Sequence, residues 1–141
     1  MPRAYRAMKG DGGRPMLGAS ASTLGVRPGV DIHPDEPGQV QPETGGMSVS
    51  PSLSTIPLRF LPRRLHDSGV QPGAIGSNSL HVWAMGTGKF EKGSVAEHLI
   101  LRPDPGDPQR HGFVEPATTM MLQQYVDAVI STREHWIVDE S

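Results

Sequence analysis

Short stretches in which apolar and polar residues alternate recur along the chain, and this period of two is typical of β-strands. The first stretch places Tyr5 and Arg6 on opposite faces of a strand, and Trp83 is the expected apolar anchor of a later one. Segments rich in glycine and proline separate the stretches and indicate turns. Strands are therefore predicted at 3–9, 39–41, 47–50, 80–85, 98–102 and 111–116.

Near the C-terminus the spacing of apolar residues changes to three and four, which indicates an amphipathic α-helix. The helix is predicted over 118–136, with Thr118 or Thr119 as its N-cap. We expect its apolar face to pack on the predicted sheet. The residues of this face are Leu122, Tyr125, Val126, Val129, Ile130, Trp136 and Ile137.

The segment 44–50 contains a glycine pair, Gly45 and Gly46, directly before a predicted strand. Such a pair permits backbone conformations that are closed to other residues, and it lets a ligand or a second strand approach closely. Ser48 follows at the strand entry, where its hydroxyl is free to face a cleft. Two interpretations are open: a hairpin turn between two ordinary strands, or a turn that presents Ser48 in a functional site.

Length and composition favour a single domain over 1–141, because 141 residues are enough for one sizeable core. The chain contains 17 glycines and 14 prolines, a share that predicts short elements joined by long ordered loops. It contains only two Trp, two Tyr and three Phe, so each aromatic residue is expected to have a fixed place in a core or a cleft.

Charge and cysteine content exclude several classes of function. The net charge is −2 and the pI is near 6.3, so nothing indicates bulk nucleic-acid binding or attachment to a membrane surface. The absence of cysteine excludes disulfides, thiolate metal sites and a cysteine nucleophile, and it fits a reducing cytoplasm. No apolar run reaches the roughly 18 residues of a membrane span. The N-terminal residues lack the apolar region of a Sec signal peptide, so a protein of this sequence that leaves its cell is expected to use another route.

Histidines and acidic residues do not form a recognisable metal motif. The sequence His33-Pro34-Asp35 lies in an acidic, proline-rich segment that is expected to face solvent, and it lacks the convergent ligands of a metal site. No metal is predicted. Among the six histidines, His111 is the most suggestive because it lies near Glu115, and its position at a strand start favours a structural role.

The segment 57–64 combines apolar residues, among them Phe60, with Arg59, Arg63 and Arg64. One interpretation is a loop that packs through its apolar residues and leaves its charges in water. The other is a cationic wall of a cleft, or a strip that binds a partner.

Three residues suited to one reaction lie in order along the chain: Arg6, Ser48 and Glu115. Cleavage of nicotinamide from NAD needs a cation or donor for the pyrophosphate or ribose, and Arg6 meets that need. The nicotinamide needs a hydroxyl, which Ser48 provides, and an aromatic wall. Glu115 supplies a carboxylate to stabilise the oxocarbenium-like sugar that forms when the bond breaks. The candidates for the aromatic wall are Tyr5, Phe60 and Trp83.

Three motifs carry a family resemblance. They are Tyr-Arg-Ala at 5–7, Gln-Pro-Glu-Thr-Gly-Gly-Met-Ser-Val at 41–49, and His-Gly-Phe-Val-Glu-Pro-Ala-Thr-Thr-Met at 111–120, the last leading into the predicted helix. In this order they resemble the cytostatic type VI secretion effector toxins, whose fold is similar to that of ADP-ribosyltransferase toxins. The resemblance covers most of the chain, with a weaker match over 50–110.

The resemblance implies an α+β fold with a twisted, split β-sheet around a cleft, long Pro/Gly-rich loops and a C-terminal amphipathic helix. It implies NAD as cofactor, a macromolecular target and an immunity protein that neutralises the toxin. Arg6, Ser48 and Glu115 match the family motifs by position and are the expected catalytic residues. The residues expected to contact NAD are Tyr5, Arg6, Gly46, Ser48, Phe60 and Trp83.

The expected function is that of an NAD-dependent ADP-ribosyltransferase-like toxin, which acts on an unknown macromolecule in the cytoplasm of a target cell. The alternative is a non-enzymatic protein-interaction module on the same fold, which would bind through Phe60, Arg63 and Arg64. NAD binding separates the two hypotheses, because the module predicts none.

Overall fold

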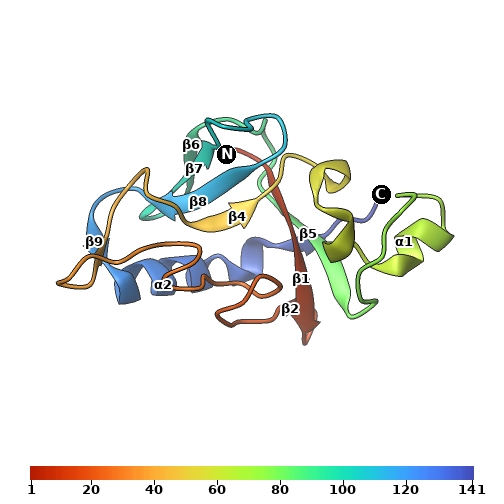
Figure 1. Cartoon of the computed structure of the whole chain (residues 1–141), viewed down its shortest axis with the longest axis horizontal. Helices are drawn as coiled ribbons and strands as arrows, with labels where there is room; N and C mark the ends of the chain where they lie inside the picture. Colours follow the sequence, from red (N-terminus) through yellow and green to blue (C-terminus); the bar gives the residue numbers. More distant parts are fainter.

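The computed structural model describes residues 1–141, and its longest strand, β1 (Ala4–Asp11), lies at the centre of the first sheet. β1 pairs antiparallel with β5 (Leu80–Met85) along the whole of β5. Two short strands complete the sheet: β2 (Arg14–Pro15) pairs with the end of β1, and β10 (Ile137–Val138) flanks β5. β1 thus brings the N-terminal segment into the interior of the molecule (Figure 1).

A second sheet is formed by the middle of the chain. Its strands are, in spatial order, β4 (Met47–Val49), β8 (Gly112–Pro116), β7 (Leu99–Pro103) and β6 (Gly93–Ala96). All of their pairings are antiparallel. The two sheets meet where the backbones of Tyr5 and Ser50 exchange two hydrogen bonds, each 2.8 Å long. This junction places the start of β1 beside the end of β4.

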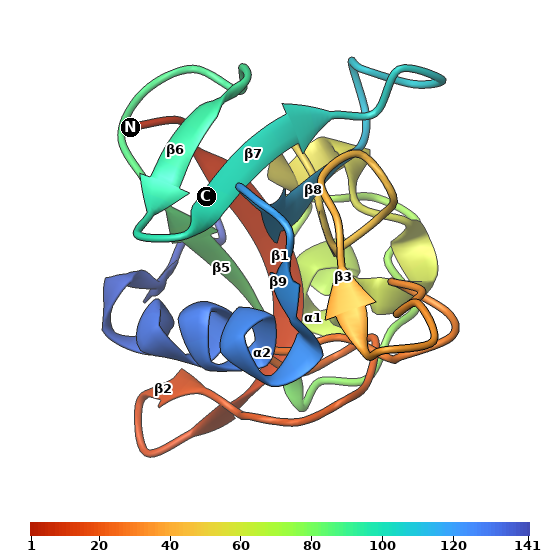
Figure 2. The same ribbon diagram turned by 90° about the vertical axis from the view of Figure 1, so that its left-hand side faces the viewer.

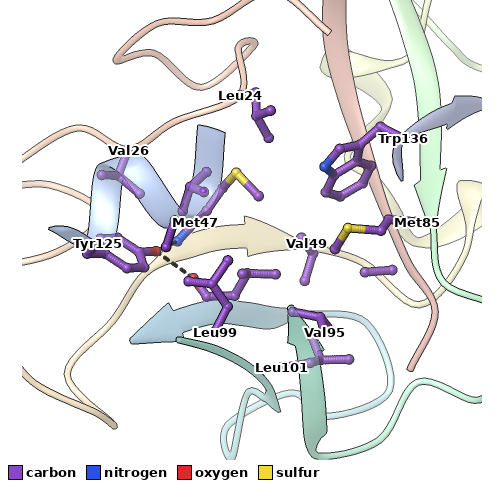
Figure 3. Packing of buried hydrophobic residues seen from close by; sticks show 14 of the residues in the cluster. Leu24, Val26, Met47, Val49, Met85, Val95, Leu99, Leu101, Tyr125 and Trp136 are labelled. Carbon is purple, nitrogen blue, oxygen red and sulfur yellow. Dashed lines mark hydrogen bonds between the residues drawn. The ribbon is translucent and has the colours of Figure 1, made fainter. Parts of the chain in front are cut away.

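The helix α2 (Leu122–Ser131) supplies much of the main core. It follows the short strand β9 (Met120–Met121), which pairs with β3 (Gln39–Val40), and Figure 2 shows it below the second sheet. The core contains 19 buried residues, and Figure 3 shows Tyr125 of α2 beside Val26 and Met47, with Met85 and Trp136 at the other end of the cluster.

A smaller core of seven residues covers the other face of the first sheet. It lies beneath three short helices, η1 (Leu53–Thr55), η2 (Leu58–Phe60) and α1 (Arg63–Asp67). Ala7 belongs to this smaller core and Met8 to the main one, which confirms the predicted alternation of faces along the first strand.

The six predicted strands all occur, but the hairpin interpretation of the glycine pair is wrong. β3 and β4 flank Gly45 and Gly46, yet β3 pairs with β9 while β4 pairs with β8. The glycines therefore join strands of two different ladders. Helix α1 and strand β6 were not predicted, because a five-residue helix and a four-residue strand carry little periodic signal.

The C-terminal helix is shorter than the predicted 118–136. Met120 and Met121 remain extended because they pair with β3, so neither Thr118 nor Thr119 caps the helix. The side chain of Gln124 instead accepts the Met121 N–H at 3.1 Å. After α2, the turn η3 (Arg133–His135) places the next residue, Trp136, in the main core.

The molecule is a mixed α+β structure in which every pairing between named strands is antiparallel. None of its helices combines the length and the apolar character needed to cross a bilayer.

Candidate functional site

A pocket of about 290 Å³ lies at the junction of the two sheets. Tyr5 and Arg6 of β1 and Ser48 of β4 line it. Further lining residues come from the 21–31 loop, from the segment around η1 and η2 that includes Phe60, and from His111 before β8. Because ligand pockets span roughly 300–1,000 Å³, this one fits a fragment of a dinucleotide rather than the whole molecule.

Arg6 is only 7% exposed, and backbone carbonyls hold its guanidinium in place. Nε and Nη2 donate to the carbonyl of Thr23 at 3.2 and 2.9 Å, and Nη2 also donates to that of Ser20 at 3.2 Å. Nη1 donates to the carbonyl of Ser48 at 2.8 Å. Arg6 therefore connects β1, β4 and the 20–23 loop, which are the segments that surround the pocket.

The charge of Arg6 has no carboxylate partner. All ion pairs of the molecule involve other residues. Burial lowers the pKa of Arg6 to about 10, because loss of water disfavours the charged guanidinium, and the nearby charge of Asp31 opposes this effect in part. Arg6 is still charged at neutral pH. A buried cation that lines a pocket and has no carboxylate within ion-pair distance favours an anionic ligand.

Two more arginines give the pocket a positive lining. Arg27 forms a 2.9 Å ion pair with Asp31, whereas Arg59 is exposed and has no acidic partner. The Arg59 guanidinium lies 4.6 Å from the centre of the Phe60 ring. Burial raises the pKa of Asp31, but the hydrogen bonds from Arg27 outweigh it and the pKa is lowered overall. The lining therefore holds three arginines and one ionised aspartate.

Ser48 is half-buried, and its hydroxyl makes no hydrogen bond within the protein, although its carbonyl accepts from Arg6. The hydroxyl is therefore available to a ligand in the pocket that it lines. Tyr5 lines the same pocket, and its hydroxyl is bonded to Arg3 at 3.1 Å and to Asp139 at 3.2 Å. Four predicted site residues thus meet here: Tyr5, Arg6, Ser48 and Phe60.

Glu115 does not line the pocket. Its side chain is 1% exposed, and its carboxylate accepts from Nε of Arg102 at 3.0 Å and from the Glu43 N–H at 3.3 Å. Ser48 pairs with Phe113 across the ladder, so Glu115 lies beyond the Phe113 side chain on the same face of β8. The catalytic role predicted for Glu115 remains a prediction, and it would require Arg102 to release the carboxylate.

Trp83 and Gly46 also lie outside the pocket lining. Trp83 is 2% exposed, and its indole N–H donates to the carbonyl of Met8 at 2.9 Å, as expected for a core residue. At Gly46 a Cβ atom would lie 2.5 Å from the carbonyl oxygen of Val114. Gly46 therefore permits the close approach of β8. The sequence predicted that the glycine pair would admit either a ligand or a second strand, and here it admits a strand.

Neither Asp31 nor Arg27 was predicted from the sequence to belong to a site. No local signal indicates their ion pair, because a spacing of four residues brings side chains together on a helix and 27–31 is not helical. Sequence reasoning also interpreted His111 as structural, whereas His111 contributes to the pocket wall. The side chains of His, Asp and Glu form no cluster of three or more that could bind a metal ion.

Comparisons of the chain with protein-family models, with curated proteins and with solved structures give no match.

Proposed function

We propose that the protein is an NAD-dependent ADP-ribosyltransferase-like toxin that binds the nicotinamide, the adjoining ribose and the pyrophosphate of NAD in the pocket between its two sheets, with the rest of the molecule outside it. The observation that carries this proposal is the convergence of Tyr5, Arg6, Ser48 and Phe60, which come from three separate parts of the sequence. An ADP-ribosyltransferase-like arrangement of the split sheet is part of the proposal, and the junction at Tyr5 and Ser50 supports it.

The lining suits the two chemical parts of the substrate. NAD combines an anionic pyrophosphate with a flat nicotinamide ring. Arg6 and Arg59 provide positive charge for the pyrophosphate, and the rings of Tyr5 and Phe60 provide walls for the nicotinamide. The Ser48 hydroxyl is free to bond the carboxamide.

The reaction needs negative charge beside the ribose as nicotinamide departs, because the sugar develops oxocarbenium character. Asp31 is the carboxylate of the lining, and its lowered pKa keeps it ionised at neutral pH. We assign it the charge-stabilising role in the pocket, which requires its ion pair with Arg27 to share the carboxylate with the ribose. As a toxin, the protein would act in the cytoplasm of a target cell, and an immunity protein would protect the producing cell by binding it.

The second candidate is a non-enzymatic interaction module. The observation that favours it is Glu115, whose carboxylate is held by Arg102 outside the pocket. Such a module would bind no NAD and would release no nicotinamide. Expression in a bacterial cytoplasm adds a further distinction: growth arrest that is lost in Ser48→Ala supports the enzyme, because this change removes only a hydroxyl that no other residue uses.

Arg59 provides the sharpest test of NAD binding, because it is exposed and makes no bond that the fold needs. We expect Arg59→Ala to weaken NAD binding about fivefold to tenfold, since it removes a cation from the proposed phosphate site. The affinity of the unchanged protein should also fall as salt is added. Isothermal titration calorimetry with NAD measures both effects.

Arg63→Ala is the matched control, because Arg63 is an exposed arginine on the adjacent helix α1 and does not line the pocket. It should bind NAD as the unchanged protein does. Equal weakening of NAD binding in Arg59→Ala and Arg63→Ala would show that NAD affinity depends on the total positive charge of this region and not on a phosphate site at Arg59. Absence of NAD binding by the unchanged protein would refute the proposed function.

A further inference from the structure

His111 lies where β8 begins, and a carboxylate fixes its ring. Nδ1 lies 2.9 Å from Oδ2 of Asp104, on the same connection between β7 and β8. Asp104 is itself held, because its Oδ1 accepts the Gly106 N–H at 2.9 Å. The ring of Phe113 contacts the imidazole edge to face, with 4.8 Å between ring centres.

This arrangement determines which nitrogen of His111 faces a ligand. A carboxylate can only accept, so Nδ1 of the neutral ring carries the hydrogen that it donates to Asp104. Nε2 then has a free lone pair, and no group of the protein bonds to it. The hydrogen bond from His111, followed by that from Gly106, lowers the pKa of Asp104, so the partner carboxylate is ionised near neutral pH. The side chain of His111 is 32% exposed and lines the pocket.

The two other candidate bases, Asp31 and Glu115, are already bound by arginines. Asp31 accepts three hydrogen bonds from Arg27. Glu115 lies outside the pocket in its ion pair with Arg102. Among the side chains that line the pocket, His111 is the one with an unoccupied proton-accepting nitrogen.

We propose that Nε2 of His111 is the general base of this pocket and that Asp104 positions it. This inference rests on the proposed function. The bond between nicotinamide N1 and ribose C1′ breaks, and its electron pair leaves with nicotinamide. An oxygen of the acceptor, or of water, forms a new bond to C1′ and transfers its proton to Nε2. The products are nicotinamide and the ADP-ribosylated acceptor, or free ADP-ribose.

Several charged groups surround His111. Asp104 contacts its ring directly, and Arg102 on β7 lies 5.1 Å from the centre of the Phe113 ring that packs against the imidazole. The charged residues that line the pocket together with His111 are Arg6 on β1, Arg27 and Asp31 on the 21–31 loop, and Arg59 on η2.

The test measures nicotinamide released from NAD in water, together with NAD affinity by calorimetry. His111→Gln should lower turnover about 10²-fold to 10⁴-fold, the usual contribution of a general base, with little change in NAD affinity. His33→Gln is the matched control, because His33 is exposed and lies outside the pocket. Added imidazole should restore part of the turnover of His111→Ala, because the ring position is open to solvent.

Asp104→Asn tests the positioning role. Removing the carboxylate disfavours imidazolium, so the acidic limb of the pH–rate profile should move to lower pH and turnover should fall. A purely structural role for Asp104 would leave this limb in place.

The outcomes separate the two proposals. If the unchanged protein releases nicotinamide and His111→Gln does so within about twofold of it, the general-base role is overturned while the proposed function stands. Loss of turnover in His111→Ala without rescue by imidazole, and with an unmoved profile in Asp104→Asn, also overturns it. Failure of the unchanged protein to bind or cleave NAD overturns the proposed function and, with it, this inference.

Discussion

Glu115 and Arg102 form the most deeply buried ion pair of the molecule, with side-chain exposures of 1% and 14%. Burial raises the pKa of Glu115, and the hydrogen bonds from Arg102 offset only part of this effect. The fold therefore favours the neutral form of Glu115 more than water does. An amide of the same shape should then be tolerated, whereas loss of Arg102 leaves a buried charge without a partner.

We expect Arg102→Ala to lower the free energy of unfolding at neutral pH by about 3 kcal/mol. Glu115→Gln should change it by less than about 1 kcal/mol, because the amide oxygen still accepts from Arg102. Urea denaturation measures both. Equal losses in the two variants would contradict this account of the pair.

The same pair makes stability depend on pH. A carboxyl group whose pKa is raised by folding contributes stability that is fully present below its unfolded pKa and is lost as the pH rises through its folded pKa. Arg102→Ala should therefore regain stability between neutral pH and about pH 4, near the ordinary pKa of Glu. The double variant Arg102→Ala, Glu115→Gln is the control, because it has no carboxyl group at this site and should show no such gain.

At the scale of elements, Tyr125 connects α2 to the second sheet. Its hydroxyl accepts the Met47 N–H of β4 at 3.0 Å and donates to the Val114 carbonyl of β8 at 2.5 Å. Burial raises the pKa of this hydroxyl well above its ordinary value, so it remains a donor at every physiological pH. One side chain thus fixes the helix against both β4 and β8.

Tyr125→Phe should lower the free energy of unfolding by about 1–3 kcal/mol, because it leaves a buried N–H and a buried carbonyl without this partner. Thermal and urea unfolding measure the loss. Tyr5→Phe is the matched control: its hydroxyl bonds to Arg3 and Asp139 in a partly exposed position, so we expect a smaller loss. A larger loss in Tyr5→Phe than in Tyr125→Phe would contradict the role assigned to Tyr125.

At the scale of the whole molecule, the C-terminal residues connect the β5 edge of the first sheet to other parts of the chain through ion pairs and a hydrogen bond. Glu140 forms a 2.6 Å ion pair with Arg64 of α1, and its carboxylate accepts the Val82 N–H at 3.0 Å. Asp139 likewise forms a 2.6 Å ion pair with Arg3 at the start of the chain. These contacts connect the tail to two segments that are distant in sequence.

Glu140→Ala should accelerate hydrogen exchange of the Val82 amide by about tenfold or more, because a charge-assisted hydrogen bond is lost at the sheet edge. Nuclear magnetic resonance measures this amide individually. Glu134→Ala is the control, since Glu134 pairs with Arg14 at an exposed position and does not contact β5. Unchanged exchange in Glu140→Ala would show that β10 protects this edge without the carboxylate.

The sequence alone determined the elements whose signal is local. Alternation identified β1, β5, β7 and β8, and spacing of three and four identified α2, because each pattern depends only on which face of an element is buried. It also determined four residues that the pocket brings together, Tyr5, Arg6, Ser48 and Phe60. Their chemical types already indicated a cation, a hydroxyl and two aromatic walls.

Tertiary structure decided the rest, because pairing partners and buried charges depend on contacts between distant residues. It joined β4 to β8 rather than to β3, and it ended the predicted helix early by pairing Met120 and Met121 with β3. It held Glu115 to Arg102 outside the pocket and brought Asp31 and His111 into the lining. No local pattern carries these outcomes, since an ion pair or a ladder forms only when the whole chain places its members together.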